Sequence, residues 1–590
     1  MQYIKILIAV ILMFATAHAA EFYVSTSGDN NNSGASGAPW RTVQYAVNHV
    51  NAGDVIYVLD GIYNELVTFN VSGSAAGGYI TLQNAPGHAP VLDATGLTGS
   101  LPALIKIVNR GYIRVSGFEI RNLITSNTGV FPAGIWVRGE SHHIEIRSNR
   151  VHHIQQNNGA NAGAHGIAIY GTSGNAAIHD ILLDNNEVRD CILGWSEALV
   201  LNGNVRNFVV SNNVVHDCNN IGYDFIGFEG ECSGCSGNFG DNVDRARDGL
   251  VTGNIVYNID SNGNPAYGTE RSADGFYVDG GANIIFERNI AYNCNLGFEL
   301  ASEHFGKTTE GVIVRNNFIF NNQVLGISTG GYSSGTGPGG GEARNNYIVN
   351  NTFYHNTTSD RPADNWGAEI LLQNRNIDNV YKNNIVYARS GRPRASIDGA
   401  LNSGNVWGNQ LYFGSNAGST PGSVMSADPL LSDPGNGDLH IAANSPAVDA
   451  GETLDTSIVG TVDFDGNNRI GGAAIDIGAH EANAGVVAIV PGDGDALPQT
   501  PVLYQNYPNP FNPATMIRFD LPETSHVKLV VYNVDGQKVA TLIDETLAPG
   551  SYQQRWNAAD GQGNELAAGV YYLRLVSGNF EKTIKALLIK

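Results

Sequence analysis

Several carboxylates lie at corresponding positions of a repeated strand pattern and together could bind a cation or transfer protons. Glu229 and Glu299 occupy the third position of segments of the form Gly-apolar-x-apolar, and Asp274 and Asp279 flank another such segment. Carboxylates on adjacent strands lie about 5 Å apart and repel one another. A folded protein tolerates this repulsion when a cation binds between them, when they share a proton, or when the group has a function that offsets the cost. Calcium takes about six to eight oxygen ligands. The candidate metal ligands are therefore Glu229, Asp274, Asp279 and Glu299, with calcium as the expected ion.

Aromatic and basic side chains are expected beside these carboxylates. Trp136 and Arg138 occupy the same strand pattern nearer the N-terminus, where an indole and a guanidinium would bind the face of a sugar and a carboxylate. Glu287, beside a turn on a different strand, is expected to be a solvated charge. An idle acidic face in an acidic protein is the alternative to a site. The candidate substrate-binding residues are Trp136, Arg138, Tyr170 and His304.

A template that occurs eight times positions these residues. Its second residue is always Asn, and successive asparagines lie 27 to 41 residues apart, the length of one supersecondary unit with variable loops. Each asparagine lies between two short alternating strands, and a third strand begins near a glycine further upstream. The eight residues are Asn149, Asn186, Asn213, Asn254, Asn289, Asn317, Asn351 and Asn384.

This template predicts a right-handed parallel β-helix with three short strands per coil. Asn suits a corner of each coil because it tolerates a left-handed backbone and can hydrogen-bond to the same amide one coil away. An antiparallel sandwich also has many short strands, but it gives no reason for an asparagine repeated at one corner. The expected fold class is all-β, with the β-helix followed by a small C-terminal β-sandwich.

The strand pattern also predicts which side chains share the outer face of the coils. In each Gly-apolar-x-apolar strand the apolar residues face the core, so x and the second residue after it face outward. The first outward row is expected to contain Trp136, Ala168, Val200, Glu229, Tyr277, Glu299 and Ser328, and the second row Arg138, Tyr170, Asn202, Asp279 and Ala301.

Length, charge and the N-terminal segment limit the class of protein. A solenoid accommodates 590 residues because each repeat packs only on its neighbours. The net charge of -22 argues against nucleic acid as a partner, because phosphate binding needs a basic face. Residues 1–20 have the charged, apolar and Ala-x-Ala regions of a signal peptide. No other apolar run is long enough to span a membrane, so we expect no transmembrane span in the mature chain. We expect the protein to be secreted or on the cell surface, and to be a monomer.

Four segments follow the signal peptide. We expect the β-helix over residues 21–425. Residues 426–482 resemble the end segment of exported bacterial β-helix proteins, sometimes described as a choice-of-anchor module, and would form the last coil and a cap. Residues 483–502 have the Gly, Pro and Asp content of a linker. Residues 503–590 contain "YPNPFNP", "VYNVDGQKV" and "GVYYLRL" and resemble the type IX secretion C-terminal sorting domain, which implies export across an outer membrane by that machinery.

The cysteines leave their pairing open. Cys191 and Cys218 share one template position on adjacent coils, within disulfide range, and the alternative is a row of reduced buried thiols. Cys294 lies two coils beyond Cys218 and is too far to pair with it. Cys232 and Cys235 form a Cys-x-x-Cys pair, which would be a small disulfide or half of a zinc site.

The segments "APGHAPVLDATG" and "SADGFYVDGG" are similar to β-helix polysaccharide lyases of the family nine type. That resemblance implies that aspartates hold a calcium ion, that calcium neutralises a uronate carboxylate, and that a lysine removes the neighbouring proton. Where the family has two aspartates, Gly, an aromatic residue and a third aspartate, this chain has Ala273–Tyr277, which keeps one of the three acids. The resemblance makes Lys307, Arg271 and Tyr277 the candidate catalytic residues, with Lys307 as the nearest lysine and Arg271 as its substitute. Residues 130–390 resemble exported β-helix proteins more closely, without an implied activity.

Three hypotheses about function follow. The first, which is favoured over the other two, is calcium-assisted β-elimination of an acidic polysaccharide. The second is glycoside hydrolysis by paired carboxylates of the same groove, because carboxylates one or two coils apart match the separations in retaining and inverting enzymes. The third is a surface protein that binds glycans or adheres without turnover, with Trp136, Tyr170 and Tyr277 as stacking platforms. The partner in each case is a polysaccharide, and the sequence does not name the sugar.

Overall fold

The structure is a computed structural model. Two segments of the chain that the sequence predicts lie mostly outside the residues that it describes. These parts are the signal peptide and the linker 483–502. The chain divides into two compact units, residues 1–428 and residues 429–590. None of the described helices is long and apolar enough to cross a membrane. The described residues are 19–99, 101–235, 243–359, 367–397, 399–482, 487–489 and, with short gaps, 500–588.

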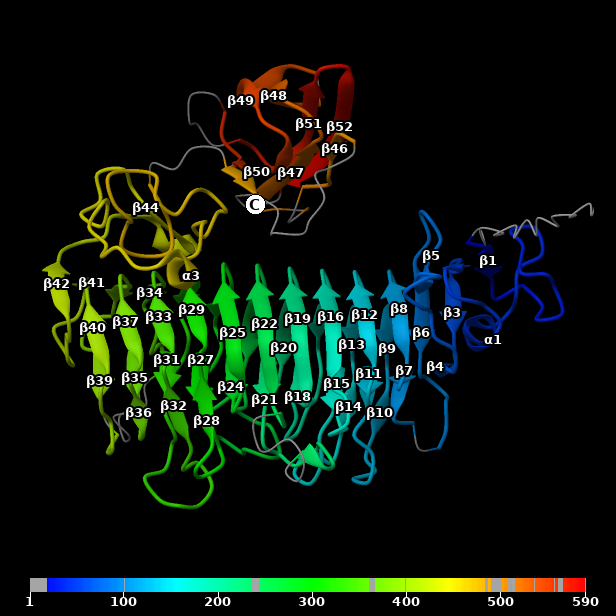
Figure 1. Ribbon diagram of the computed structural model, residues 1–590, viewed down its shortest axis with the longest axis horizontal. Coiled ribbons are helices and arrows are strands. Elements are labelled where there is room, and N and C mark those ends of the chain that lie inside the picture. Colours follow the sequence, from blue (N-terminus) through cyan, green and yellow to red (C-terminus); the bar gives the residue numbers. More distant parts are fainter. Residues whose placement is uncertain are drawn as a thin grey trace, which may run out of the picture. The chain divides into compact units, whose positions relative to one another are not determined.

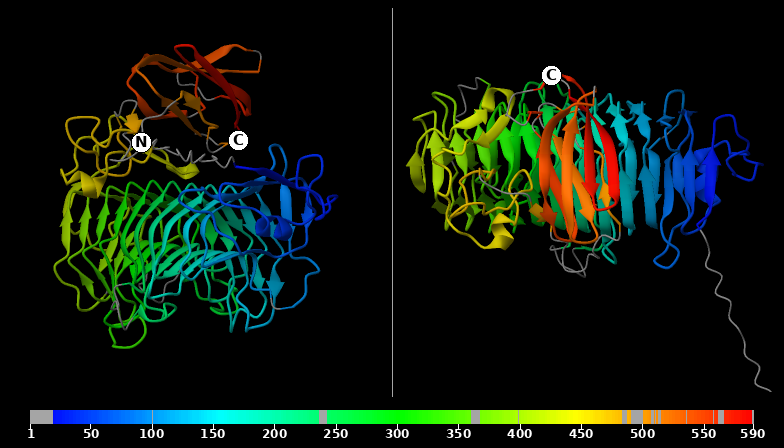
Figure 2. Two further views of the ribbon diagram at one scale, coloured as in Figure 1. Left: turned by 45° about the vertical axis from the view of Figure 1, so that its right-hand side comes forward. Right: turned by 90° about the horizontal axis from the view of Figure 1, so that it is seen from above.

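The first unit is a parallel β-helix of three long sheets, as the asparagine template predicts (Figure 1). Consecutive coils place their strands side by side, and neighbouring strands pair in parallel in all three sheets (Figure 2). Most coils contribute one strand to each sheet.

The sheet of 16 strands contains β1 (Glu21–Val24), β2 (Val55–Val58), β5 (Ile80–Asn84), β8 (Gly111–Ser116), β12 (His142–Arg147), β16 (Ile178–Asp184), β19 (Val205–Ser211), β22 (Ala246–Thr252), β25 (Ala282–Glu287), β29 (Ile313–Arg315), β33 (Tyr347–Val349), β37 (Val380–Lys382) and β40 (Val406–Gly408), with β28 (Thr308–Glu310), β32 (Glu342–Arg344) and β36 (Asn376–Ile377) beside this path.

The sheet of 11 strands contains β4 (Val67–Phe69), β7 (Ala103–Val108), β11 (Ala133–Arg138), β15 (His165–Gly171), β18 (Leu199–Gly203), β21 (Tyr223–Ile226), β24 (Asp274–Asp279), β27 (Leu296–Ala301), β31 (Leu325–Thr329), β35 (Ile370–Leu372) and β39 (Ala395–Ile397).

The sheet of 13 strands contains β3 (Gly61–Tyr63), β6 (Pro90–Asp93), β9 (Glu119–Arg121), β13 (Arg150–His152), β17 (Glu187–Arg189), β20 (Val214–Cys218), β23 (Ile255–Ile259), β26 (Ile290–Tyr292), β30 (Phe318–Phe320), β34 (Thr352–Tyr354), β38 (Ile385–Tyr387), β41 (Gln410–Phe413) and β42 (Ser423–Ser426), and a separate pair is formed by β10 (Ile124–Thr125) and β14 (Gln155–Gln156).

The template asparagines form a buried hydrogen-bonded ladder. The side-chain oxygen of Asn289 accepts from the backbone N–H of Asn254 at 2.9 Å and from its side-chain amide at 3.0 Å. Asn289 in turn donates from its backbone to Asn317 at 2.8 Å, and from its side chain to the Val251 carbonyl at 2.9 Å. The same contacts recur from Asn149 to Asn384. Each buried amide is therefore satisfied by the next coil.

One part of the corner prediction is wrong. The left-handed residue is the one before the ladder asparagine, as at Asn185 (φ 56°), Asn212 (φ 55°) and Arg288 (φ 58°). The ladder asparagines do not have a positive φ, because their side chains must point inward and along the axis to reach the next coil. Sequence spacing located the corner but assigned the left-handed turn to the wrong one of its two residues.

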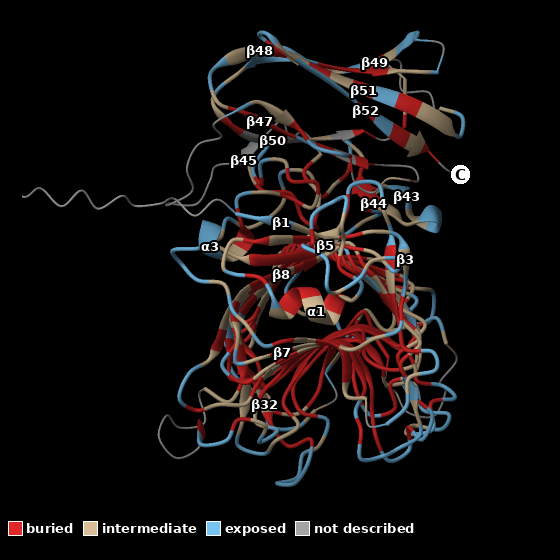
Figure 3. Ribbon diagram, turned by 90° about the vertical axis from the view of Figure 1, so that its right-hand side faces the viewer, coloured by how far each residue is buried: buried red, intermediate tan, exposed pale blue. Residues whose placement is uncertain are grey.

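Apolar side chains fill the interior of the coil, and a short helix covers its first end. Tyr223, Phe276 and Phe298 stack on consecutive coils, with centroids 4.7 and 4.6 Å apart. The helix α1 (Val43–Asn48) buries Val43, which belongs to the same core, and lies across the end of the coil among the buried strands (Figure 3). This helix, which the repeat pattern does not predict, shields the open end of the solenoid from solvent.

Glu287 is not the solvated charge that the sequence suggested. It is buried and accepts hydrogen bonds from the Arg315 guanidinium at 2.9 and 2.6 Å. The two residues are paired on adjacent strands, β25 and β29. The position therefore holds a buried ion pair between coils, for which both charged partners are needed.

The thiols of the coil are free, and the loop pair is bonded. Cys191, Cys218 and Cys294 are buried and form no disulfide. The row of reduced thiols, the alternative to a Cys191–Cys218 disulfide, is therefore what the structure has. A hydrogen bond with the Cys191 thiol, together with burial, raises the pKa of Cys218. Cys232 and Cys235 form a disulfide, so they do not offer a thiolate pair to zinc.

The second unit contains a small β-sandwich, as predicted. One antiparallel sheet contains β45 (Val487–Ile489), β46 (Val502–Leu503), β47 (Thr515–Leu521) and β50 (Gly550–Trp556), and the other contains β48 (Ser525–Tyr532), β49 (Lys538–Leu547), β51 (Gly569–Ser577) and β52 (Phe580–Leu588). Their inner faces form one apolar core. Before the sandwich, residues 429–482 hold β43 (Leu431–Asp433), η1 (Pro434–Asn436), β44 (Asp438–Ile441) and α3 (Thr456–Val459).

Replacing a ladder asparagine should destabilise the β-helix. The change Asn289→Ala removes the acceptor of the buried Asn254 amide and a donor to the Val251 carbonyl. We expect a loss of about 2 to 3 kcal/mol and a lower melting temperature. Thermal or urea unfolding followed by circular dichroism measures this. The exposed Asn262→Ala is the matched control, and equal stability of the two variants would contradict the ladder argument.

Candidate functional site

A cleft of about 1030 Å³ lies along the 11-stranded sheet, where most of the predicted residues meet. Its floor comes from outward side chains of β11, β15, β18, β21, β24 and β27, and its rims come from the loops between coils. Nine of the described lining residues are carboxylates: Glu197, Asp224, Glu229, Glu231, Glu270, Asp274, Asp279, Glu299 and Glu303.

The observed register confirms the first outward row except at one position. Trp136 pairs with Ala168, then Val200, Asp224, Tyr277, Glu299 and Ser328 follow on successive strands. Asp224 therefore occupies the place predicted for Glu229. The strand of this coil is β21, and it begins after Gly222 rather than at Gly227.

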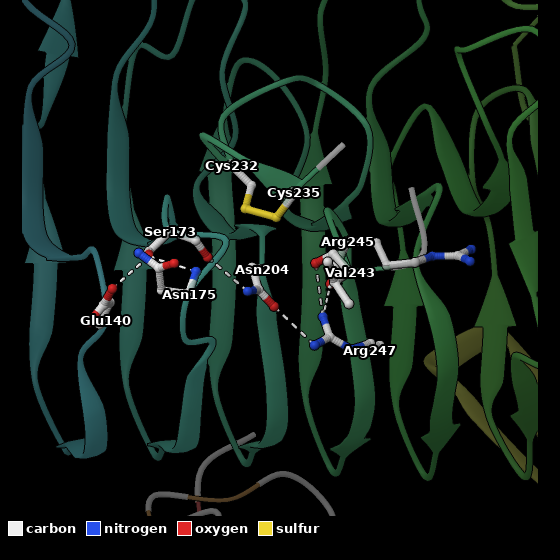
Figure 4. The surroundings of a disulfide bond; sticks show 9 residues. All are labelled: Glu140, Ser173, Asn175, Asn204, Cys232, Cys235, Val243, Arg245 and Arg247. Carbon is white, nitrogen blue, oxygen red and sulfur yellow. Dashed lines mark hydrogen bonds between the residues drawn. A yellow bond between two sulfur atoms is a disulfide. The ribbon is translucent and has the colours of Figure 1, made fainter. Parts of the chain in front are cut away.

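Glu229 lies in the loop after β21 and is exposed at the rim. The same loop contains the Cys232–Cys235 disulfide and pairs with Ser173 through the bridge at Ser233 (Figure 4). A hydrogen-bonded chain beneath it links Arg247 to Asn204 at 2.9 Å and Asn204 to the Ser173 carbonyl at 2.8 Å. This rim is thus anchored to the coils at several points.

Asp224 and Asp274 are buried carboxylic acids on the cleft floor. They are 2% and 1% exposed, and one side-chain oxygen of each, Oδ1, has no hydrogen-bond partner. Burial raises the pKa of both well above the ordinary value. The neighbouring charges of Glu197 and Glu299 add to the effect on Asp224 and Asp274 respectively. Burial therefore favours the protonated form of both carboxyls over the ionised form.

Glu299 has a more polar environment than Asp224. Its Oε1 accepts from the Ser328 hydroxyl at 3.0 Å and from the Gln373 amide at 2.7 Å. Burial raises the pKa of Glu299 to about 7, and these two hydrogen bonds oppose the rise by favouring the carboxylate. Tyr277 lies between Asp224 and Glu299 in the row, and burial raises its pKa too.

The predicted metal ligands divide between two places. Two of them, Glu229 and Asp279, meet His304, which was predicted to bind substrate, and potential ligand atoms of the three residues all lie within 4.8 Å of one another. His304 Nε2 lies 2.9 Å from Glu229, and Asp279 accepts from the Glu303 backbone N–H at 2.8 Å. Burial and the Glu303 charge raise the pKa of Asp279. Asp274 and Glu299 lie beside this cluster on the cleft floor.

A buried histidine supports the far side of the cleft. His165 Nδ1 faces the Glu197 carbonyl at 3.1 Å, and its Nε2 faces the Tyr170 hydroxyl at 3.2 Å. Burial lowers the pKa of His165 to about 4, so the imidazole is neutral. Burial raises the pKa of Glu197 to about 8, with contributions from the Glu229 and Glu303 charges. This carboxyl is protonated at neutral pH.

Aromatic rings surround the acidic floor. The Arg138 guanidinium lies 5.1 Å from the centre of the Trp136 ring and 3.5 Å from Glu231, so the predicted pair is at the cleft. Trp195 is 51% exposed, donates from its indole N–H to the Ala160 carbonyl at 3.0 Å, and contacts Tyr267. Such fixed, half-exposed rings are suited to contact the apolar face of a sugar.

Two of the predicted catalytic residues do not line the cleft. The Lys307 ammonium lies 5.1 Å over the Phe228 ring, behind the rim that holds Glu229. Arg271 lies 3.8 Å from Asp260 and lines a separate hollow with Asn293 and Asn321. Arg271 lies in the loop before β24 and Lys307 in the loop between β27 and β28, so neither belongs to an outward strand row whose facing side alternation predicts.

Asp224, Glu197 and His165 are cleft residues that the sequence analysis missed. For Asp224 a signal was present, because "GYDF" fits the Gly-apolar-x-apolar pattern as well as "GFEG" does. Gly222 stacks against Gly275 of the next coil, where a β-carbon would lie 2.8 Å from the Gly275 carbonyl oxygen. Glu197 precedes its strand and His165 begins one, so the alternating pattern does not identify either residue.

The cleft carboxyls should make stability depend on pH. Glu197 has a pKa of about 8 when folded and an ordinary value of 4.5 when unfolded, so the folded chain keeps a proton that the unfolded chain releases. The contribution of Glu197 to the free energy of unfolding is therefore complete below about pH 4.5, and it is lost as the pH rises to about 8. Glu197→Gln should flatten the fall in melting temperature, and the exposed Glu140→Gln should not. Identical profiles for both variants and the parent would contradict this.

Two family models match the chain. The model described as "Pel9A-like, right handed beta helix region" matches residues 22–191, and the one described as "FlgD Ig-like domain" matches residues 511–579. These matches agree with the right-handed β-helix and the C-terminal β-sandwich. Among solved structures, pectate lyase Pel9A has a TM-score of 0.44 at 15% identity, covering 79% of this chain and 97% of its own.

Two curated proteins are similar in sequence. Pectate lyase PEL9 of Emericella nidulans is 28% identical over 144 residues, which cover 23% of this chain and 35% of the lyase. The uncharacterized protein YwoF of Bacillus subtilis is 34% identical over 449 residues, which cover 72% of this chain and 91% of YwoF. The extent of this second match shows that the chain belongs to the same family of right-handed β-helix proteins as YwoF.

Proposed function

We propose that this protein is a carbohydrate-active enzyme that hydrolyses glycosidic bonds in its acidic cleft. The observation that carries the proposal is the pair Asp224 and Glu299, which flank Tyr277 in one row of the cleft floor. Both carboxyls are buried, yet their surroundings differ. Glycoside hydrolases need two carboxyl groups in different protonation states on opposite sides of the bond that breaks.

The two environments assign the roles. Asp224 has an oxygen without a hydrogen-bond partner, and burial raises its pKa, so it is the general acid that protonates the leaving oxygen. Glu299 accepts two hydrogen bonds that favour its ionised form, so it is the base that activates water. Tyr277, between them, would contact the sugar in the cleaved linkage.

The spacing of the coils supports inversion of the anomeric centre. Asp224 and Glu299 are two strands apart in register, which corresponds to about 9.5 Å between backbones. Inverting enzymes place their carboxyls about 6.5 to 9.5 Å apart to admit a water molecule, whereas retaining enzymes need about 5 Å.

The charge of the cleft favours a neutral glycan over a polyuronate. Arg138 is the only Lys or Arg side chain among the described lining residues, against nine carboxyl groups, and even the carboxyls that stay protonated offer no attraction to an anionic polymer. An anionic polymer would need an added cation to enter. Trp136, Trp195 and Tyr267 offer apolar faces that a neutral sugar can cover.

Removing either carboxyl should stop hydrolysis while leaving the fold intact. Asp224→Asn and Glu299→Gln are each expected to lower kcat by at least about a hundredfold on a neutral glycan that the parent enzyme cleaves. New reducing ends measure turnover, and nuclear magnetic resonance of the first product gives its anomeric configuration. Glu270→Gln, at the exposed rim, is the matched control. Full activity of both floor variants would refute the assignment.

A second candidate is calcium-assisted β-elimination of an acidic polysaccharide. The Glu229–Asp279–His304 cluster and the bare oxygens of Asp224 and Asp274 favour a cation. The carboxylate oxygens fit calcium, and the His304 imidazole is a poorer ligand for it. Bound calcium would neutralise a uronate carboxylate. The described cleft lining contains no lysine to remove a proton, and this makes elimination the weaker candidate.

Calcium should raise the melting temperature if the cluster is its site. A dication relieves the mutual repulsion of Glu229, Asp279 and Glu303, so we expect several degrees of stabilisation at calcium far above its dissociation constant. Magnesium should stabilise less because it gives up its water reluctantly. Asp279→Asn should respond much less than the parent. Coincident melting curves with chelator, calcium and magnesium would show that the cluster does not bind calcium. Calcium-assisted elimination, with its ultraviolet-absorbing products, would then lose its support.

Export and surface attachment remain part of the proposal. Residues 1–20 would direct secretion, and residues 503–590 would engage type IX machinery, with the enzyme acting as a monomer on an external polysaccharide. If neither hydrolysis nor elimination occurs on any tested glycan that binds, the same cleft is a glycan-binding surface, with Trp136 and Trp195 as its aromatic contacts.

A further inference from the structure

Three imidazoles and one carboxylate meet at a corner of the β-helix, on residues that do not line the cleft. His142 of β12 and His179 of β16 are register partners on adjacent coils, and their rings stack with centroids 5.3 Å apart. The residues that follow them, His143 and Asp180, both have left-handed backbones, with φ of 52° and 55°. Because the two corners turn alike, the four side chains form one patch across two coils, the histidine corner.

The ligand-type atoms of this corner point at one another. Asp180 Oδ2 lies 2.7 Å from His179 Nδ1 and 3.5 Å from His143 Nε2. Potential ligand atoms of the three residues all lie within 4.8 Å of one another. Ligands of one tetrahedral zinc ion lie about 3.3 Å apart, since each is about 2.0 Å from the metal. Small side-chain rotations would therefore bring all three onto one ion.

His142 and Tyr112 hold His143 in place. His142 Nδ1 lies 3.0 Å from His143 Nδ1, and Tyr112 stacks on the His143 ring with centroids 4.2 Å apart. When His143 Nδ1 donates this hydrogen bond, its Nε2 carries a lone pair toward Asp180. This is the tautomer that a metal-binding imidazole requires, with its second nitrogen fixed by a neighbour.

We propose that the histidine corner binds a divalent transition cation, zinc or copper(II), through His143, His179 and Asp180, with His142 as a positioning residue. Imidazole nitrogen favours these metals over calcium, which prefers oxygen. The His179 and Asp180 side chains are 28% and 43% exposed, so an ion reaches them from solvent. The net charge of -22 raises the local cation concentration.

Calorimetric titration of the untagged full chain, stripped by chelator, with zinc and copper(II) tests the site. We expect one ion per chain at the histidine corner, undiminished by excess calcium. His143→Asn keeps a residue that tolerates the left-handed corner and removes the imidazole, and His179→Gln removes the second ligand. Each should weaken binding at the corner by at least about tenfold, while circular dichroism stays unchanged.

Matched variants separate this site from others. His153→Asn alters another left-handed histidine, whose Nδ1 lies 2.7 Å from that of His152, and it should leave zinc binding intact. Loss of the ion in His304→Gln or His480→Gln, but not in His143→Asn and His179→Gln, would overturn the proposal by placing the metal in the other clusters. Absence of binding by the parent would overturn it as well.

Zinc X-ray absorption of the parent chain gives a readout that does not rely on a folded variant. Two imidazole nitrogens and oxygen in the zinc shell are expected. A shell of oxygen alone, or one with a single imidazole, would contradict the assignment of His143 and His179.

Discussion

The fold depends on the hydrogen-bonded stacking of one coil on the next. In the core this takes the form of the asparagine ladder, where each buried side-chain oxygen receives the amide of the preceding coil and each side-chain amide returns to a strand carbonyl. A buried amide without a partner costs about 1 to 3 kcal/mol, so a gap would weaken two coils at once. The ladder keeps successive coils in one register, and that register aligns every row of side chains on the outside.

The cleft is a consequence of that register. Rows of outward residues lie one strand spacing apart, so chemically unlike positions of the sequence become neighbours, such as Val200, Asp224, Tyr277 and Glu299. Burying several carboxyls in one place is unfavourable, and their raised pKa values reflect this cost. A structure that served only to stack coils would gain stability from apolar residues there. The retained acids are therefore the strongest physical reason to look for function on this face.

The same stacking also produces the histidine corner, where the aligned side chains are exposed to solvent and not buried as on the cleft floor. Corner residues with left-handed backbones recur on successive coils, as at Tyr112, His143, Asp180 and Asn207. Their side chains project together into solvent, and a row of this kind becomes a cluster wherever two consecutive coils carry ligand-type residues. The cleft floor and the histidine corner thus differ in chemistry. Burial raises the pKa of the carboxyls on the floor, whereas the side chains of the corner stay accessible to ions from solvent.

The sequence by itself determined the β-helix, the asparagine ladder and most of the first outward row, because these follow from alternation and from an amide that repeats at one corner. It also placed Trp136, Tyr277, Asp279 and Glu299 on one face. Only the tertiary structure decided which of two adjacent Gly-aromatic segments forms the strand, and therefore that Asp224 and not Glu229 enters the row. It likewise brought Glu197 and His165 to the cleft and removed Lys307 and Arg271 from its lining. Loops of variable length carry these residues, and their paths depend on packing against neighbouring coils, which alternation along the chain does not encode.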